Sequence, residues 1–213
     1  MDRLYLDHYA RLLSFAKIAL DGPKSVKIRD QFWGGRTLSL SRMRIPKIEG
    51  TIESITIYSN PMDSEQTRAI LRWTRWDADS ARRSTQTDAE LGRPPSIALP
   101  VVDIRSAWVD MQWVEQSINR LERIQLPLKS PYFQSTSKVM HQLRLERVDN
   151  TLIDIVWKAE TTHGFEPLEA LWQALWDQMK SLLRDNEVVN YEELWETSHQ
   201  MLQPTHTYSN LLE

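Results

Sequence analysis

The sequence predicts a single α+β domain in which a mostly antiparallel sheet of five to six strands packs against three to four helices. Three observations favour this class. Short runs rich in Ile, Thr, Ser and Trp occupy residues 25 to 76, two alternating runs flank Asp149-Asn150, and segments with helical periodicity lie before, between and after them. With 213 residues, of which 41% are hydrophobic, the chain is long enough to bury a core.

The first element is predicted to be an amphipathic helix over residues 3 to 20. Apolar residues recur there at three- and four-residue spacing, and Gly22-Pro23 follows as a stop signal. Residues 25 to 76 then predict three or four strands, because β-like runs are separated by turn-forming residues. The separators are Gly34-Gly35, Pro46, Gly50 and Asn60-Pro61.

Two of these strands change the face on which their apolar residues lie. Leu38 and Leu40 alternate on one face, whereas Met43 falls on the other, and Ile52 gives way to Ile55 in the same manner. A strand with one buried face would need a bulge or bend to keep these residues together. We therefore expect irregularities near residues 41 and 53.

Residues 66 to 76 fit both a strand and a helix. Ala69, Leu71 and Trp73 alternate as in a strand, while Ala69, Trp73 and Trp76 also suit a helix, and we prefer the strand. Residues 77 to 100 contain almost no large apolar side chain, which predicts a long, mobile loop. Its composition does not distinguish a functional loop from a disordered one.

The middle of the chain predicts a helix and then a hairpin. Residues 103 to 124 carry a helical stripe with Asp103 as its N-cap. Residues 138 to 160 carry two alternating runs, and a three-residue loop over residues 148 to 150 places their apolar residues on one face. This register pairs Leu145 with Ile153, Leu143 with Ile155 and His141 with Trp157, and leaves Asn150 in a left-handed conformation.

Two helices are predicted near the C-terminus. One opens after Glu166-Pro167, since proline suits the first turn, and carries an apolar stripe that includes Trp172. The other starts at Asn190, with Glu193 placed as in a capping box. The domain is expected to span residues 1–202, and residues 203–213 to form a flexible tail.

The net charge of −3 conceals a separation along the chain. Residues 24 to 47 are strongly basic and residues from 160 onward are strongly acidic. Complementary ends of this kind predict that two copies could meet head to tail. No apolar run is long enough to cross a bilayer, and the chain contains no cysteine, so we expect an intracellular protein without disulfides.

The search for chemistry is negative. The six glycines form neither GxGxxG nor GxxxxGK[ST], and the five histidines are dispersed, with none in HExxH. Asp77 and Asp79 offer two carboxylates, which is too few for a metal site. We expect no catalytic residues, no metal and no cofactor.

Two clusters favour binding rather than catalysis. The first is basic and aromatic and suits nucleic acid or an anionic membrane surface, although a half-buried sheet with a charged outer face also produces it and is the preferred explanation. It consists of Arg36, Arg42, Arg44, Arg68, Arg72, Arg75, Trp33, Trp73 and Trp76. The second suits a protein interface, although core packing is the preferred role of its tryptophans. It consists of Trp172, Trp176 and Trp195.

The resulting expectation is a non-enzymatic interaction or scaffolding protein, such as an adaptor, an assembly or immunity factor, or a self-associating structural protein. Its partners would be another protein or further copies of itself. The first alternative is a protein that binds RNA, DNA or anionic lipid through the basic and aromatic cluster. The second is a small-molecule pocket with His141 and Trp157 in its lining.

Overall fold

The computed structural model describes most of the chain. The described residues are 3–34, 36–44, 51–60, 65–93, 101–125, 139–146, 152–159, 165–194 and 205–208. The helices among them are α1 (Arg3–Asp21), α2 (Ala78–Glu90), α3 (Met111–Glu122) and α4 (Glu166–Asp185). The strands are β1 (Ser25–Ile28), β2 (Gln31–Gly34), β3 (Arg36–Arg44), β4 (Thr51–Tyr58), β5 (Arg68–Asp77), β6 (Val101–Asp110), β7 (Val139–Glu146), β8 (Leu152–Lys158), β9 (Glu192–Leu194) and β10 (Thr205–Tyr208).

The strands form one large and one small sheet. The large sheet has the order β10-β6-β5-β4-β3-β7-β8, and the small sheet has the order β2-β1-β9. All pairings are antiparallel except that of β10 with β6, which is parallel. The predicted α+β fold, with six antiparallel strands and four helices among the described residues, is confirmed.

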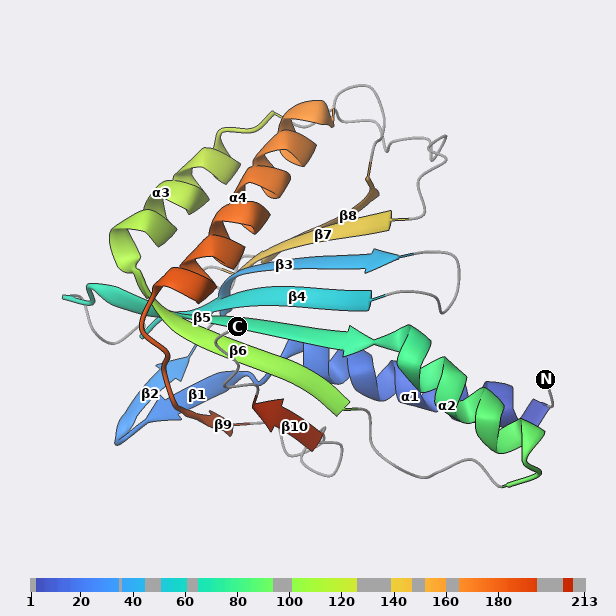
Figure 1. The fold of residues 1–213 in the computed structure, drawn as a ribbon. Helices are drawn as coiled ribbons and strands as arrows, with labels where there is room; N and C mark the ends of the chain where they lie inside the picture. The colour runs from blue at the N-terminus through green and yellow to red at the C-terminus, as the bar shows by residue number, and fades with distance from the viewer. Residues whose placement is uncertain are drawn as a thin grey trace.

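Helices lie on both faces of the large sheet. Helices α3 and α4 lie over one face, called the α4 face, and α1 and α2 lie toward the other, called the α1 face, beside the small sheet (Figure 1). The α4 face buries Leu38, Leu40, Ile55, Ile57 and Leu71 against Trp172 and other residues of α4. The α1 face buries Ile52 and Trp76 against Leu12 and Ala16.

Burial on both faces explains why the apolar phase changes along β3 and β4. The pairing of Leu40 with Ile55 continues through Ser41 to Met43 opposite Ile52 without a shift. The predicted bulges near residues 41 and 53 are therefore wrong, because Met43 and Ile52 contact the second core beneath α1. The register shift in this ladder lies between Arg36 and Leu38 instead.

The hairpin of β7 and β8 has the predicted register. Leu145 pairs with Ile153, Leu143 with Ile155 and His141 with Trp157. Residue Asn150 lies outside the described residues, so its predicted conformation stays a prediction. The strand preferred for residues 66 to 76 is confirmed as β5, and the helices predicted at residues 3 to 20 and after Glu166 are confirmed as α1 and α4.

Only the second half of the helix predicted over residues 103 to 124 is helical, and the first half is a strand. Residues Val101–Asp110 form β6, and α3 begins only at Met111 with Asp110 as its N-cap, whose carboxylate accepts a hydrogen bond from the backbone N–H of Gln112 at 2.7 Å. Strand β6 is paired with β5 and buries residues on both faces, Ile104 on one and Val109 on the other. Such a strand lacks the alternation by which half-buried strands are recognised.

Three further segments differ from expectation. The loop predicted at 77–100 contains helix α2, which packs Ala81 on the core beneath α1 and is followed by Gly92 with φ +64°. The helix predicted from Asn190 is replaced by strand β9, which pairs with β1. The predicted tail contains β10, paired with β6. In these segments, pairing or packing with distant residues outweighs local propensity.

Candidate functional site

The basic and aromatic cluster predicted from the sequence is divided between the two faces of the sheet. Strand β5 alternates, so that Arg68 and Arg72 lie on the α1 face with Ile70, while Trp73 and Arg75 lie on the α4 face. Arg42 also lies on the α4 face, opposite Glu53. The side chains of Arg36 and Arg44 lie outside the described part of the structure. These residues therefore do not form one continuous basic surface.

The tryptophans assigned to binding surfaces are mostly buried. Trp33, Trp73 and Trp76 are at most 7% exposed, and each belongs to a different apolar cluster. Trp172 and Trp176 are 0% and 3% exposed, so the core-packing alternative accounts for them and the predicted interface role is corrected. Trp195 lies outside the described residues.

Arg72 is buried in the α1 face and paired with the C-terminal part of the chain. Its Nε donates to Glu193 Oε1 at 2.9 Å, and its Nη1 donates to the hydroxyl of Thr74. Burial alone would lower the pKa of Arg72, but the charge of Glu193 and the nearby Tyr191 and Tyr58 raise it well above its ordinary value. Arg72 is a permanently charged interior residue and is inaccessible to a phosphate.

The turn after α1 closes tightly over this ion pair. Gly22 has φ +77°, and a Cβ placed on it would lie 2.7 Å from Tyr58 Oη and 3.1 Å from Arg72 Nη1. Tyr58 Oη donates to the backbone carbonyl of Pro23 at 3.0 Å. The position thus requires glycine for both its backbone conformation and the space that it leaves.

The acidic C-terminal region folds back onto the basic strands. Besides the pair of Arg72 with Glu193, Glu187 pairs with Arg68 at 3.5 Å, and Glu192 lies opposite Lys27 in the small sheet. Part of the acidic region is thereby placed against basic residues of the same chain. The predicted head-to-tail association of two copies stays a prediction.

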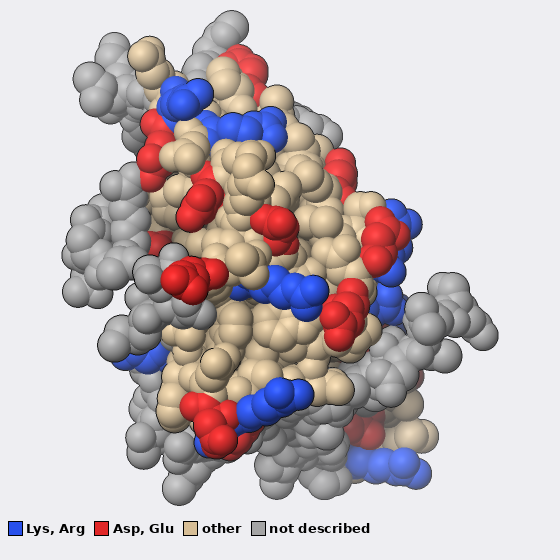
Figure 2. Space-filling model, turned by 90° about the vertical axis from the view of Figure 1, so that its left-hand side faces the viewer, with Lys and Arg blue, Asp and Glu red and all other residues tan. Residues whose placement is uncertain are grey.

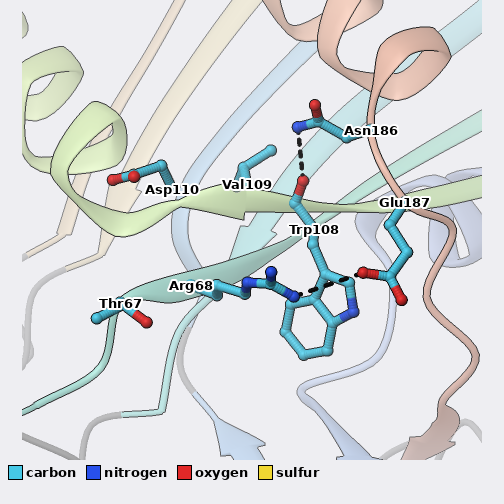
Figure 3. A pocket seen from close by; sticks show the side chains of 7 residues that line it. All are labelled: Thr67, Arg68, Trp108, Val109, Asp110, Asn186 and Glu187. Atoms are coloured by element: carbon cyan, nitrogen blue, oxygen red, sulfur yellow. Dashed lines mark hydrogen bonds and ion pairs between the residues drawn. The ribbon is translucent and has the colours of Figure 1, made fainter.

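A cavity of about 360 Å³ lies where this segment meets the end of β6. Thr67, Arg68, Trp108, Val109, Asp110, Asn186 and Glu187 line it. Figure 3 shows Asn186 donating to the carbonyl of Trp108 and Glu187 facing Arg68 beside the indole, with distances of 2.7 and 3.5 Å. The charges pair with each other, and acidic and basic side chains are interspersed over this end of the molecule (Figure 2). The lining carries one basic residue, Arg68, and two acidic residues, Asp110 and Glu187, so its excess charge is negative and does not suit an anionic ligand.

His141 and Glu169 form a buried pair beneath α4. The Nδ1 of His141 lies 3.1 Å from Glu169 Oε2, and Trp157 Nε1 donates to the same oxygen. The His141 ring stacks on Trp172 at 3.7 Å, and Trp172 stacks on Trp176 at 4.9 Å. His141 is 3% and Trp157 1% exposed, so the small-molecule pocket predicted around them is filled core.

Hydrogen bonds and nearby charges keep two glutamates of this region, Glu169 and Glu53, ionised. Burial alone would raise the pKa of Glu169, but the hydrogen bonds from His141 and Trp157 lower it below its ordinary value. Burial would likewise raise the pKa of Glu53, but the hydrogen bond and charge of Lys180, the hydrogen bond from Trp73 and the charge of Arg42 together lower it. Both carboxylates are ionised partners of the α4 face rather than proton donors.

A second cavity, called the α4 cavity, lies between α4 and strands β5 and β6. Its volume is about 430 Å³, and its lining consists of Trp73, Arg105, Asp177, Lys180, Leu183 and Arg184. The sequence placed only Trp73 in a binding cluster. The sequence does not single out Arg105, because the pattern around it predicts a helix instead of strand β6. Lys180 is also not singled out, because a basic residue on an acidic helix forms no distinctive pattern. The available signal for Lys180 is its position one helical turn after Trp176.

Strand β8 forms the described edge of the large sheet opposite β10, and β7 is its one neighbour among the described strands. Its exposed apolar side chains are Leu152, Ile153 and Val156, at 51%, 37% and 43% exposure. Soluble proteins usually protect such edges, because the unpaired backbone and apolar side chains invite another strand. An open apolar edge is therefore a candidate interaction surface.

Comparisons with known proteins add no further constraint: no family model, no curated protein and no solved structure matches this chain. Within the part of the chain that the structure describes, no group of three or more His, Asp or Glu residues is placed to hold a metal ion. In the same residues, no helix has both the length and the apolar character needed to cross a membrane. The candidate interaction surface is thus the edge strand β8.

Proposed function

We propose that this chain is a non-enzymatic interaction protein that associates with a second copy of itself through strand β8. The observation that carries the proposal is the open edge on which Leu152, Ile153 and Val156 are exposed. A second strand added there would continue the large sheet across two copies. Main-chain hydrogen bonds would supply affinity, and the alternate side chains would supply specificity.

The backbone N–H and C=O groups of alternate residues in β8 point away from β7, as pairing with another strand requires. The N–H of Ala159 donates to the carbonyl of Val139, so the odd-numbered residues of β8 direct their backbone groups toward β7. Residues Leu152, Asp154, Val156 and Lys158 therefore direct theirs outward. These four side chains also share the α1 face of the sheet, which the pairing of Asp154 with Arg144 at 3.3 Å illustrates.

The charges of the strand favour one register. A twofold axis at Val156 places Val156 opposite its own copy, Asp154 opposite Lys158 of the second copy, and Lys158 opposite Asp154. Opposite charges in cross-strand pairs stabilise an antiparallel ladder, and like charges destabilise it. An axis at Asp154 would instead place the two Asp154 carboxylates against each other. The Val156-centred register is the self-complementary one.

The test is the mass of the protein in solution over a concentration series. The native chain should show a monomer and dimer in equilibrium, and V156K should shift it to monomer because two lysines then meet at the axis. V188K is the matched control, since Val188 is 64% exposed and lies far from β8 in the sequence. A native chain that stays monomeric at the highest concentration, or a V156K variant that dimerises normally, contradicts the proposal.

A charge exchange tests the register. K158D should weaken the dimer by placing aspartates opposite each other, and the double variant D154K/K158D should restore it. Equal loss in the single and double variants would show that the axis does not lie at Val156.

A further inference from the structure

We infer that the α1 face contains a binding site for an extended acidic segment of a partner protein, and that residues 186–194 of the chain itself, called the strap, occupy this site. The strap follows α4, passes beside β6 and ends in β9 next to β1 (Figure 1). Peptides that bind by strand addition use backbone hydrogen bonds to a sheet edge and alternate side chains in pockets. The strap is held in the same two ways.

The backbone of the strap is bonded to the edges of two strands. The N–H of Trp108 donates to the carbonyl of Glu187 at 3.0 Å, and the N–H of Val189 donates to the carbonyl of Ser106 at 3.4 Å. Farther along, residues 192–194 pair antiparallel with residues 25–27 of β1. Because these contacts use backbone atoms, another extended segment can make them in place of the strap.

The side chains of the strap alternate between solvent and the α1 face. Those on the solvent side are exposed, namely Val188, Asn190 and Glu192. Val189 and Tyr191 pack on the apolar cluster that contains Val26 and Ile70, and Glu193 reaches Arg72 between them and β1. A segment with so little of its surface buried opens at a lower free energy than the strands around it.

Arg72 gives the site its preference for a carboxylate. Its Nε donates to Glu193 at 2.9 Å, and the two side chains are 0% and 7% exposed, so a neutral replacement leaves a buried charge uncompensated. A ligand must therefore replace Glu193 rather than bind beside it. Nη2 of Arg72 is buried and has no hydrogen-bond partner within the described residues. Since Nε and Nη2 share one edge of the guanidinium, a carboxylate placed side-on binds both.

These contacts define the partner segment by its chemistry. It is extended and carries an apolar residue, an aromatic residue two positions later and a carboxylate two positions after that, as do Val189, Tyr191 and Glu193. Because the strap is tethered next to the site, it competes at a high effective concentration. The strap is thus an autoinhibitory contact that the partner segment displaces.

The experiment is fluorescence anisotropy of a labelled peptide with the sequence of residues 186–194, titrated with the full chain. The chain with E193Q should bind it about tenfold more tightly than the native chain, because its strap has lost the charged anchor. A peptide with E193Q should bind that variant chain about tenfold more weakly than the native peptide. A peptide with E187Q is the matched control and should keep its affinity, since Glu187 is 71% exposed.

Equal weakening by both peptide changes would reveal a non-specific charge effect and overturn the inference. Absence of binding to the folded E193Q chain would overturn it as well, and circular dichroism shows whether that chain is folded. If it is unfolded, hydrogen exchange of the native chain decides. The amide of Val189 should exchange faster than those of the central strand β5, and exchange as slow as in β5 would mean that the strap does not open. None of these outcomes depends on dimer formation through β8.

Discussion

The two faces of the large sheet are built differently. The α4 face buries aliphatic residues and the stacked rings of His141, Trp172 and Trp176, with its charged groups at the margins. The α1 face carries polar groups in its interior, including Arg72 and Thr74, which are 1% and 0% exposed. The α4 face is stabilised chiefly by apolar area, whereas the α1 face depends on specific partners. Substitutions should therefore destabilise the two faces for different reasons: loss of buried apolar area on the α4 face, and loss of a specific polar partner on the α1 face.

The largest effect is expected from W172A on the α4 face. The substitution removes a fully buried indole, its stacking on His141 and Trp176, and its hydrogen bond to the carbonyl of Gln142 at 3.0 Å. The free energy of unfolding should fall by about 3–5 kcal/mol. Urea denaturation followed by circular dichroism measures it, and a loss below about 1 kcal/mol would mean that the stack does not support this face.

The next effect is expected from E193Q on the α1 face. The glutamine keeps a hydrogen-bond acceptor for Arg72 but leaves the buried guanidinium uncompensated, so the free energy of unfolding should fall by about 3 kcal/mol. E187Q is the matched control. The side chains of Arg68 and Glu187 are 60% and 71% exposed, so the loss of their ion pair should lower the free energy of unfolding by less than about 1 kcal/mol. Similar losses in both variants would refute the special role of the buried pair.

The double variant R72M/E193M sharpens the same comparison. Replacement of both charges by apolar side chains removes the desolvation cost together with the attraction, so it should recover most of the stability that E193Q loses. If the double variant is less stable than E193Q, the pair contributes net stability to the α1 face.

A smaller effect, dependent on pH, is expected from E169Q. The pKa of Glu169 is lowered in the folded chain, so its contribution is complete above the pKa of an unfolded glutamate, about 4.3, and is lost as the pH falls through the folded value. E169Q should lower the free energy of unfolding by about 1.5 kcal/mol at pH 7 and flatten the loss below pH 4.3. Unfolding measured from pH 7 to pH 3 tests this, and an unchanged acid slope contradicts it.

The smallest effect is expected from S54A. Ser54 is 3% exposed, and its hydroxyl donates to the carbonyl of Leu20 at 2.5 Å, which joins β4 to the end of α1. Loss of this hydrogen bond should lower the free energy of unfolding by about 1 kcal/mol. S41A, whose hydroxyl donates to Gln142 in a partly buried position, is the control and should cost less. A greater cost for S41A would contradict the ranking.

The elements that the sequence predicts correctly are those with one dominant apolar pattern. The register of the hairpin of β7 and β8 is predicted correctly, because its buried apolar residues, among them Leu143, Leu145 and Trp157, alternate on the α4 face. Helix α4 is predicted for the same reason, with its stripe from Leu168 to Met179 buried. A helix or strand that is buried on one face shows an apolar periodicity, which can be recognised in the sequence without knowledge of the element that packs on it.

The elements that were missed depend on distant partners. Strand β6 is buried on both faces, so its apolar residues have no single period. Glu193 resembles part of a capping box, yet its partner is Arg72, 121 residues earlier. The α4 cavity joins Arg105 of β6 to Lys180 of α4 around Trp73, and no local pattern relates these residues. Sequence periodicity reports the local environment and cannot report which residues of other elements supply a partner.

The long separation of Arg72 from Glu193 also bears on how the chain is made. During synthesis, α1 and strands β3 to β5 leave the ribosome well before residue 193. Until then Arg72 has no carboxylate, and burying it would leave an isolated charge in the interior. We therefore expect the α1 face to close around Arg72 only after the segment that carries Glu193 has docked.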